Sequence, residues 1–235
     1  MTTHLDPLLG SAGASRPATA PDPRRWAGLA VLTASLLVVV MDMTILNVAL
    51  PDLTADLRPG AVAQLWIVDS YALVLAGLLV PLSALADRWG RRRMLLSGFT
   101  IFAVVSLLVL VADTAAHVIA LRAALGVGGA MIMPATLSLI RTLFTDPRER
   151  ATALGLWAAM AAVGGAVGPI VGGALLERFS WHAAFLFNVP VMAVAIVAGA
   201  AARTREVFTP HWEIAPATKL RNLMPSLLDA ALQMI

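Results

Sequence analysis

Residues 26–50 read WAGLAVLTASLLVVVMDMTILNVAL, an apolar run that holds one acidic residue, Asp42. The run is long enough to cross a bilayer, because a membrane-spanning helix needs roughly 20 apolar residues. A carboxylate at that depth costs roughly 2.5 kcal/mol or more on insertion scales, so it needs a partner, access to water or a proton to carry. The stretch therefore predicts a membrane-spanning helix with Asp42 as a candidate functional group.

The composition of the whole chain also indicates a membrane protein. Hydrophobic residues make up 59% of the 235 residues, charged residues 13%, and the mean hydropathy is +0.83. Soluble domains hold about 45–50% apolar and about 25% charged residues. We therefore expect an integral, multi-pass protein of the cell membrane, with the lipid bilayer as its first partner.

Several function classes are disfavoured by the residues present. The chain has no cysteine, and its histidines show no ligand spacing: His4, His117, His182 and His211. No Gly-rich phosphate loop ends in Lys-Ser or Lys-Thr, so ATP hydrolysis is not indicated. The net charge of +3 comes from arginines in short patches between apolar runs, which is typical of membrane-anchoring loops and not of nucleic-acid binding. We expect no enzyme, no metal and no cofactor, and an ion gradient as the source of energy.

Six apolar segments of spanning length follow one another along the chain. Their approximate bounds are 26–50, 65–86, 94–112, 116–140, 151–176 and 183–202. Residues 1–25 are rich in proline, glycine and small polar residues and predict a flexible cytoplasmic tail, and residues 203–235 predict a second tail with an apolar end too short to span. The predicted fold is all-α, with residues 26–202 forming a six-helix transmembrane bundle.

The distribution of arginine predicts the orientation of the bundle. With the N-terminus inside, one side receives Arg16, Arg24, Arg25, Arg88, Arg91, Arg92, Arg93, Arg141, Arg148, Arg150, Arg203 and Arg205, and the other receives Arg58 and Arg178. Since cytoplasmic loops carry the excess of Lys and Arg, both termini are expected in the cytoplasm. An even number of spans agrees with that orientation.

The connection between the second and third spans reads SALADRWGRRR over residues 83–93. Gly90 permits a positive φ in a tight turn, and Asp87 is placed to cap a helix or pair with an arginine. An ordinary positively charged loop is the alternative interpretation.

In the fifth span, Gly164, Gly168 and Gly172 recur every four residues, with Pro169 and Gly173 beside them. This spacing places the three glycines on one helix face, where another backbone can approach closely, and the proline permits a bend. Generic small-residue packing is an alternative explanation for the glycines alone.

Polar residues in the first and fourth spans indicate a site inside the bundle. Arg122 lies in the outer part of the fourth span, at a depth that Asp42 on the antiparallel first span can share, although a snorkelling arginine is the alternative. Thr44 and Asn47 form a second polar stripe on the first span, which is typical of a cavity-lining helix. Asp69 in the second span is a further acidic candidate that we expect at the membrane boundary.

Taken together, these patterns resemble the major facilitator superfamily, specifically its fourteen-helix drug:proton antiporter branch, across about residues 26–202. Residues 83–93 are similar to the motif Gly-x-Leu-Ala-Asp-Arg-x-Gly-Arg-Arg, with Ser83 in place of the first glycine. Gly164, Gly168, Pro169, Gly172 and Gly173 match the antiporter motif of the fifth span at its defining positions.

Three further segments extend the resemblance. Arg122, Gly126 and Gly128 match the motif of the fourth span, with Leu125 in place of the usual glutamine. The first-span signature is matched by Asp42, Thr44, Asn47, Ala49, Leu50 and Pro51. The start of the sixth span is matched by Trp181, Phe185, Asn188 and Pro190, with departures at His182 and Ala183.

The resemblance implies one six-helix half, built as a 3+3 repeat, of a transporter that exports drugs or small metabolites, including lipophilic cations, against an inward proton gradient. It implies proton or cation coupling by Asp42 and Arg122, and a cytoplasmic gate formed by Asp87, Arg88, Gly90, Arg91 and Arg92. The chemical basis is that burial favours a neutral carboxyl group, whereas a nearby guanidinium favours the ionised form. A change in the access of water to Asp42, or the binding of substrate, can then switch the protonation of Asp42.

Length is the main departure from the resemblance, because members of the branch are roughly twice as long as this chain. In the family, the aspartate of the loop between the second and third spans docks on the opposite six-helix half. Asp87 is expected to have no such partner within this chain. A truncated or frame-shifted product, a fragment, and a half-transporter that pairs with a second half or a second copy all remain open. The competing function is a non-transporting membrane module, such as an assembly partner or an inactive remnant.

Overall fold

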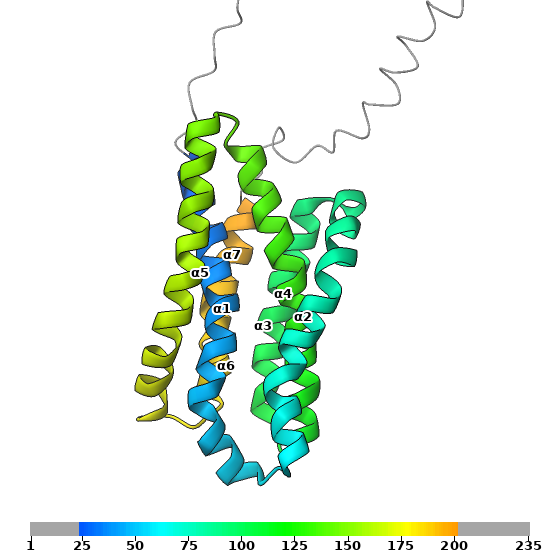
Figure 1. Ribbon diagram of the computed structural model, residues 1–235, viewed down its shortest axis with the longest axis vertical. Coiled ribbons are helices and arrows are strands. Elements are labelled where there is room, and N and C mark those ends of the chain that lie inside the picture. Colours follow the sequence, from blue (N-terminus) through cyan, green and yellow to red (C-terminus); the bar gives the residue numbers. More distant parts are fainter. Residues whose placement is uncertain (1–23, 202–235) are drawn as a thin grey trace, which may run out of the picture.

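The computed structural model describes residues 24–201, which form a bundle of long helices (Figure 1). The elements are α1 (Arg24–Leu57), α2 (Ala61–Trp89), α3 (Arg91–Leu108), the short 3₁₀ helix η1 (Val109–Val111), α4 (Ala115–Leu143), α5 (Pro147–Leu176), α6 (Ala183–Leu186) and α7 (Asn188–Ala201). Six spans in this part of the chain are long and apolar enough to cross a membrane, the third including η1 and the sixth running over Ala183–Ala200. The predicted tails lie outside the described residues, except that Arg24 and Arg25 already belong to α1.

The first helix is longer than predicted, because it passes through Pro51 and ends at Leu57. A proline inside a helix removes its own N–H donor but does not prevent the chain beyond it from staying helical. The Thr54 hydroxyl donates to the Pro51 carbonyl at 2.8 Å. The helix ends where Arg58 takes a left-handed φ of 46°, immediately before Pro59.

The fourth and fifth helices also begin before their predicted starts, and polar caps explain both positions. The Thr114 side chain accepts from the His117 N–H at 3.2 Å, so α4 starts at Ala115. The Asp146 carboxylate accepts from the N–H groups of Arg148 and Glu149, both at 3.0 Å, with a proline at the first helical position of α5. Such caps satisfy N–H groups that have no partner within the helix.

The sixth span, predicted as one continuous helix over 183–202, is divided into two helices at a single residue whose backbone stays helical. It consists of α6, a turn at Phe187, and α7, which starts at Asn188. Pro190 has no N–H to donate to the Leu186 carbonyl, so the helical ladder is interrupted at this point. Asn188 is the first residue of α7 and is buried inside the bundle.

The helices pack as two interlocked groups of three. Helix α2 packs on α4, α1 packs on α5, and α3 packs on both α4 and α7. The first group is α1, α2 and α3, and the second is α4, α5 and α7. The second helix of each group packs on the first helix of the other group, since α2 packs on α4 and α5 packs on α1. The described part of the chain is therefore an all-α bundle with the 3+3 organisation that the resemblance implies.

Glycines set the close approach of α4 to its neighbours. A Cβ at Gly126 would lie 2.7 Å from the Tyr71 carbonyl oxygen of α2, and a Cβ at Gly128 would lie 3.2 Å from the Gly98 carbonyl oxygen of α3. Both partners are backbone atoms, which cannot rotate away. The small residues beside Arg122 therefore bring α2 and α3 close to α4.

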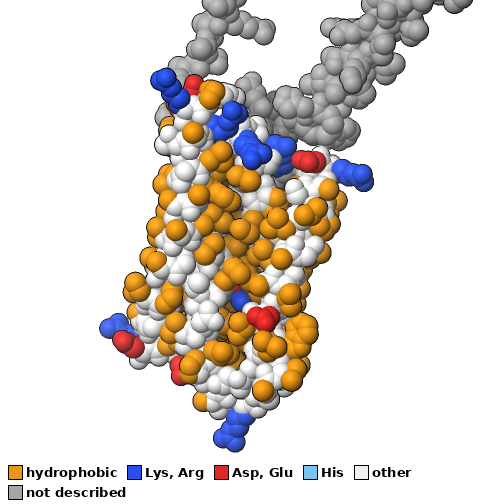
Figure 2. All heavy atoms as spheres, viewed as in Figure 1, with side chains coloured by type: hydrophobic (Ala, Val, Ile, Leu, Met, Phe, Trp, Pro, Cys, Tyr) orange, Lys and Arg blue, Asp and Glu red, His pale blue; other side chains and the backbone are white. Residues whose placement is uncertain are grey.

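Arginine side chains gather at the end of the bundle where α1 begins and α7 ends, at the top of Figures 1 and 2. The helix bounds place Arg25, Arg88, Arg91, Arg92, Arg93, Arg141, Arg148 and Arg150 at this end, and Arg58 and Arg178 at the other. Between the two ends, the face seen in Figure 2 is mostly apolar, as expected of a bundle that crosses a bilayer, with acidic and basic side chains showing part-way along it.

The turn between α2 and α3 depends on Gly90, whose φ is 98°. A side chain there is strained even though nothing lies within 4 Å of its Cβ position. We expect Gly90→Ala to destabilise the protein by roughly 1–2 kcal/mol. Gly77→Ala, in open space inside α2, is the control and is expected to be neutral or stabilising. Thermal unfolding in detergent measures both, and equal melting temperatures would contradict this role for Gly90.

Candidate functional site

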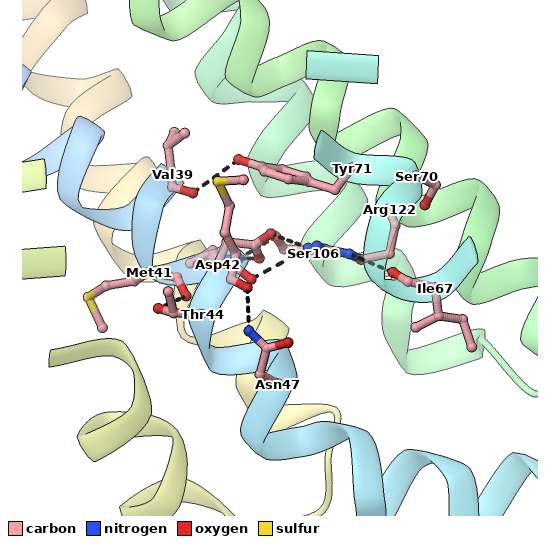
Figure 3. Close-up of polar contacts among 12 residues, drawn as sticks. Val39, Met41, Asp42, Thr44, Asn47, Ile67, Ser70, Tyr71, Ser106 and Arg122 are labelled. Carbon is pink, nitrogen blue, oxygen red and sulfur yellow. Dashed lines mark hydrogen bonds and ion pairs between the residues drawn. The ribbon is translucent and has the colours of Figure 1, made fainter. Parts of the chain in front are cut away.

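The candidate site is centred on an ion pair between α1 and α4 (Figure 3). Arg122 Nη1 donates to Asp42 Oδ2 at 2.6 Å. Asp42 is 3% exposed and Arg122 is 1% exposed. The structure thus brings together the two charges that the sequence placed at a common depth, on segments that are 80 residues apart.

Arg122 makes further contacts that hold its guanidinium inside the bundle. Its Nε donates to the Ile67 carbonyl at 3.2 Å, and its Nη1 also reaches the Asp42 carbonyl at 3.5 Å. The guanidinium carbon lies 4.5 Å from the centre of the Tyr71 ring. The snorkelling alternative is wrong for Arg122, because its cationic group points into the protein and not toward the membrane surface.

The second carboxylate oxygen of Asp42 is held by the sixth span. Asn188 Nδ2 donates to Asp42 Oδ1 at 2.8 Å and lies 3.4 Å from Ser106 Oγ of α3. Asn188 and Ser106 are both fully buried. Arg122 of α4 and Asn188 of α7 therefore bind the same carboxylate of α1, while residues of α2 and α3 contact these two side chains.

This arrangement has a defined electrostatic consequence. A buried ion pair is tolerated only when hydrogen bonds satisfy both partners, and removing one partner leaves an uncompensated charge. Asp42 and Arg122 are satisfied on each side by the contacts above. A proton or a cation that reached Asp42 would have to compete with Arg122 for the carboxylate.

Tyr71 is a site residue that the sequence analysis missed. It is fully buried, its ring faces Arg122, and its hydroxyl donates to the Val39 carbonyl of α1 at 3.0 Å. A lone tyrosine in an apolar segment gives no signal of its own. Its position one turn after Ile67, which binds the same guanidinium, becomes informative only once the α2–α4 packing is known.

We expect Tyr71→Phe to cost about 0.5–1.5 kcal/mol, because it loses one hydrogen bond and keeps the ring over Arg122. Tyr71→Ala is expected to cost about 3–5 kcal/mol, because it opens a cavity beside the guanidinium. Melting temperatures in detergent compare the two variants. A loss in Tyr71→Phe as large as in Tyr71→Ala would show that the ring contributes little.

The second polar stripe of α1 faces away from the ion pair. Thr44 donates to the Met41 carbonyl at 3.0 Å and lies against Gly168 of α5. Asn47 is exposed and reaches the Met43 carbonyl at 3.4 Å. Asp69 is partly exposed on α2. Asp42 thus faces the bundle interior, while Thr44 packs at the α1–α5 contact and Asn47 points outward.

Two of the antiporter-motif glycines of α5 lie too close to α1 to accept a side chain, and two do not. A Cβ at Gly164 would lie 2.9 Å from the Leu37 carbonyl oxygen, and a Cβ at Gly168 would collide with Thr44 Oγ1. Gly172 faces Ile45 at an ordinary 3.6 Å, and Gly173 has nothing within 4 Å. Pro169 lies inside α5, which continues through it.

The loop motif forms contacts within the bundle. Arg91 Nη2 lies 3.4 Å from Asp87 Oδ1, and Arg91 Nη1 donates to Thr142 Oγ1 at 3.3 Å. Arg92 Nη2 donates to the Gly199 carbonyl at 2.9 Å, near the end of α7. Arg88 is exposed. In this conformation the motif joins the ends of α2, α3, α4 and α7.

Solved transporter structures share this fold. The peptide transporter POT in complex with sulfate aligns with a TM-score of 0.68 and 16% identity, over 87% of this chain and 45% of that chain. An inward-facing bacterial homologue of the human lysosomal transporter Spinster aligns with a TM-score of 0.62 and 22% identity, over 77% of this chain and 42% of that chain. The bundle has the fold of one half of a membrane transporter.

The sequence match is to the family described as Major Facilitator Superfamily, over residues 32–232. The chain belongs to this superfamily, as the motifs indicated, and the match continues past residue 202, where the resemblance stated from the motifs ends. The family is one of transporters and not of enzymes.

Curated relatives of this chain are named as efflux and resistance proteins. The multidrug efflux pump LfrA of Mycolicibacterium smegmatis is 52% identical over 78% of this chain, and the methyl viologen resistance protein SmvA of Salmonella typhimurium is 44% identical over 77% of it. The puromycin resistance protein pur8 of Streptomyces alboniger is 41% identical over 75% of it. The chain spans 36% of the length of LfrA and SmvA and 35% of pur8.

Proposed function

We propose that this chain forms the six-helix half of a proton-coupled exporter of drugs or small metabolites in the cell membrane. The observation that carries the proposal is the buried ion pair of Asp42 and Arg122, which joins two different spans at 2.6 Å. Intramembrane charges are expensive and mark ion or substrate pathways. Relatives named as efflux and resistance proteins support drug export in particular.

The proposed coupling follows from competition for one carboxylate. A proton arriving at Asp42 neutralises it, so Arg122 loses its anionic partner and the contact between α1 and α4 weakens. A cationic substrate near the site favours the ionised carboxylate and hence proton release. Proton and substrate thereby occupy the site in turn, as export against an inward proton gradient requires.

The proposed orientation places the arginine-rich end of the bundle in the cytoplasm. Nine arginines of the described residues lie at that end, Arg24 and the eight named above, against two at the other, and they support this orientation through the positive-inside rule. The proposed gate at the same end involves Asp87 and Arg91, and a second half or a second copy of the chain completes the pathway.

Dye transport by the chain tests the proposal. Proteoliposomes that contain only this chain are loaded with ethidium, and a proton gradient is imposed across the membrane. Proton-driven ethidium movement above that of empty liposomes is expected if the chain transports alone or as a self-assembled pair. No movement under either gradient direction would favour the alternative, a non-transporting membrane module.

A further inference from the structure

The buried amide of Asn188 offers one atom that the ion pair does not use. Its Nδ2 donates to Asp42 Oδ1 at 2.8 Å, while its Oδ1 is buried and has no hydrogen-bond partner among the described residues. An unpaired buried acceptor is costly and rare in native proteins. It lies on the same planar group that already touches the coupling carboxylate.

We propose that Asn188 is a positioning residue that hydrogen-bonds Asp42 in both of its protonation states, by turning its side-chain amide between them. The inference rests on the proposed function, because it assumes that Asp42 gains and loses a proton. It assigns the sixth span a part in coupling.

The chemistry of the two carboxyl forms requires opposite partners. An ionised carboxylate only accepts hydrogen bonds, whereas a protonated carboxyl group carries an O–H that needs an acceptor. In the present geometry Asn188 Nδ2 serves the ionised form. A half-turn about the last side-chain torsion, which is broad and roughly two-fold for asparagine, exchanges Nδ2 for the unpaired Oδ1 and serves the protonated form.

The surroundings permit this exchange without a new charged group. Ser106 Oγ lies 3.4 Å from Asn188 Nδ2, and a hydroxyl either accepts from the amide nitrogen or donates to the amide oxygen. The other groups facing Asp42 are Arg122 of α4 and, beyond it, Tyr71 of α2. Among the side chains of the described residues that hydrogen-bond Asp42, only the amide of Asn188 has both a donor and an acceptor.

Infrared difference spectroscopy during a pH titration of the chain in lipid vesicles tests the proposal. The carbonyl band of protonated Asp42 is assigned by its loss in Asp42→Asn. The test variant is Asn188→Leu, which keeps a similar volume without a donor or acceptor. Asn47→Leu is the matched control, because Asn47 is exposed on α1 and its side-chain amide donates to the Met43 carbonyl and not to Asp42.

Asn188→Leu is expected to move the Asp42 band to higher frequency and to raise the pH midpoint of protonation by about one unit, a roughly tenfold change in proton affinity. The direction follows because the charge-assisted bond to the ionised form is stronger than the bond to the neutral form. Asn188→Gln, which retains an amide, is expected to restore part of both values. Asn47→Leu is expected to change neither.

The outcomes separate this inference from the proposed function. If folded Asn188→Leu leaves both the Asp42 carbonyl band and the pH midpoint unchanged, the inference is overturned. A shifted midpoint with an unchanged band also overturns it, because the amide then binds the ionised form of Asp42 only. If Asn188→Leu does not fold, wild-type protein labelled with ¹³C-asparagine must show an amide change that titrates with the Asp42 band, and its absence overturns the inference. If no Asp42 band titrates in the wild type, the proposed proton coupling itself is wrong.

Discussion

Asp42→Asn is expected to abolish proton-driven ethidium transport, a loss of at least tenfold in rate, because an amide cannot carry the proton. The variant also leaves the Arg122 guanidinium buried without an anion, which costs about 3–5 kcal/mol of stability. Transport is measured in proteoliposomes with matched amounts of folded protein, as judged by monodisperse elution in detergent. The prediction applies under either assembly, with a second half or with a second copy.

Two controls separate coupling from folding. Asp52→Asn makes the same chemical change on the same helix at an exposed position, and it is expected to leave transport intact. The charge-balanced variant Asp42→Asn with Arg122→Gln is expected to recover stability but not proton-driven transport, because it removes the uncompensated cation and still has no proton carrier. Transport driven by protons in folded Asp42→Asn would contradict the assignment.

The glycines of α5 give the second large prediction, this time on assembly of the bundle. Gly164→Ala is expected to destabilise the protein by about 1–3 kcal/mol, because its Cβ would lie 2.9 Å from a backbone oxygen of α1 that cannot move aside. Gly165→Ala, the neighbouring position with nothing within 4 Å, is expected to be neutral or stabilising. Melting temperatures and the yield of monodisperse protein measure the difference.

A rescue experiment tests the contact at Gly168. Gly168→Ala collides with the Thr44 side chain, so Thr44→Ala in the same chain is expected to restore part of the lost stability. The equivalent rescue is not available to Gly164→Ala, because its obstacle is the Leu37 carbonyl. If the three single variants Gly164→Ala, Gly165→Ala and Gly168→Ala melt at the same temperature, the close α1–α5 packing does not hold.

Much of the fold could be predicted from the sequence, because a helix that crosses a bilayer needs a minimum length of apolar residues and such runs are visible in the sequence. Six spans, the arginine-rich end and the close-packing role of Gly164 and Gly168 follow from run length, charge and spacing. The helix ends were less predictable. Pro51 is compatible with a continuing helix, and only the left-handed Arg58 with its following proline ends α1.

The site was predictable only in part, for a related reason. Charged residues are rare in membrane-spanning segments, so Asp42 and Arg122 could be identified as candidates from the sequence. Asn188 was named only as part of the match at the start of the sixth span, and Tyr71 was not named, because a single amide or phenol at depth has no periodic pattern. Their contacts join segments 146 and 32 residues apart. Thr44 and Asn47 were identified as polar residues of the first span. Helix periodicity predicts which residues share a face, but not which neighbouring helix packs against that face.

Proton release on binding of a lipophilic cation tests the central claim most directly. Ethidium is added to the purified protein in weakly buffered detergent solution, at a pH where the infrared band shows Asp42 protonated, and binding is followed by ethidium fluorescence. We expect binding to release protons from the wild type and to release none from Asp42→Asn. Ethidium binding without proton release, or equal release from both proteins, would contradict a carboxylate shared in turn by proton and substrate.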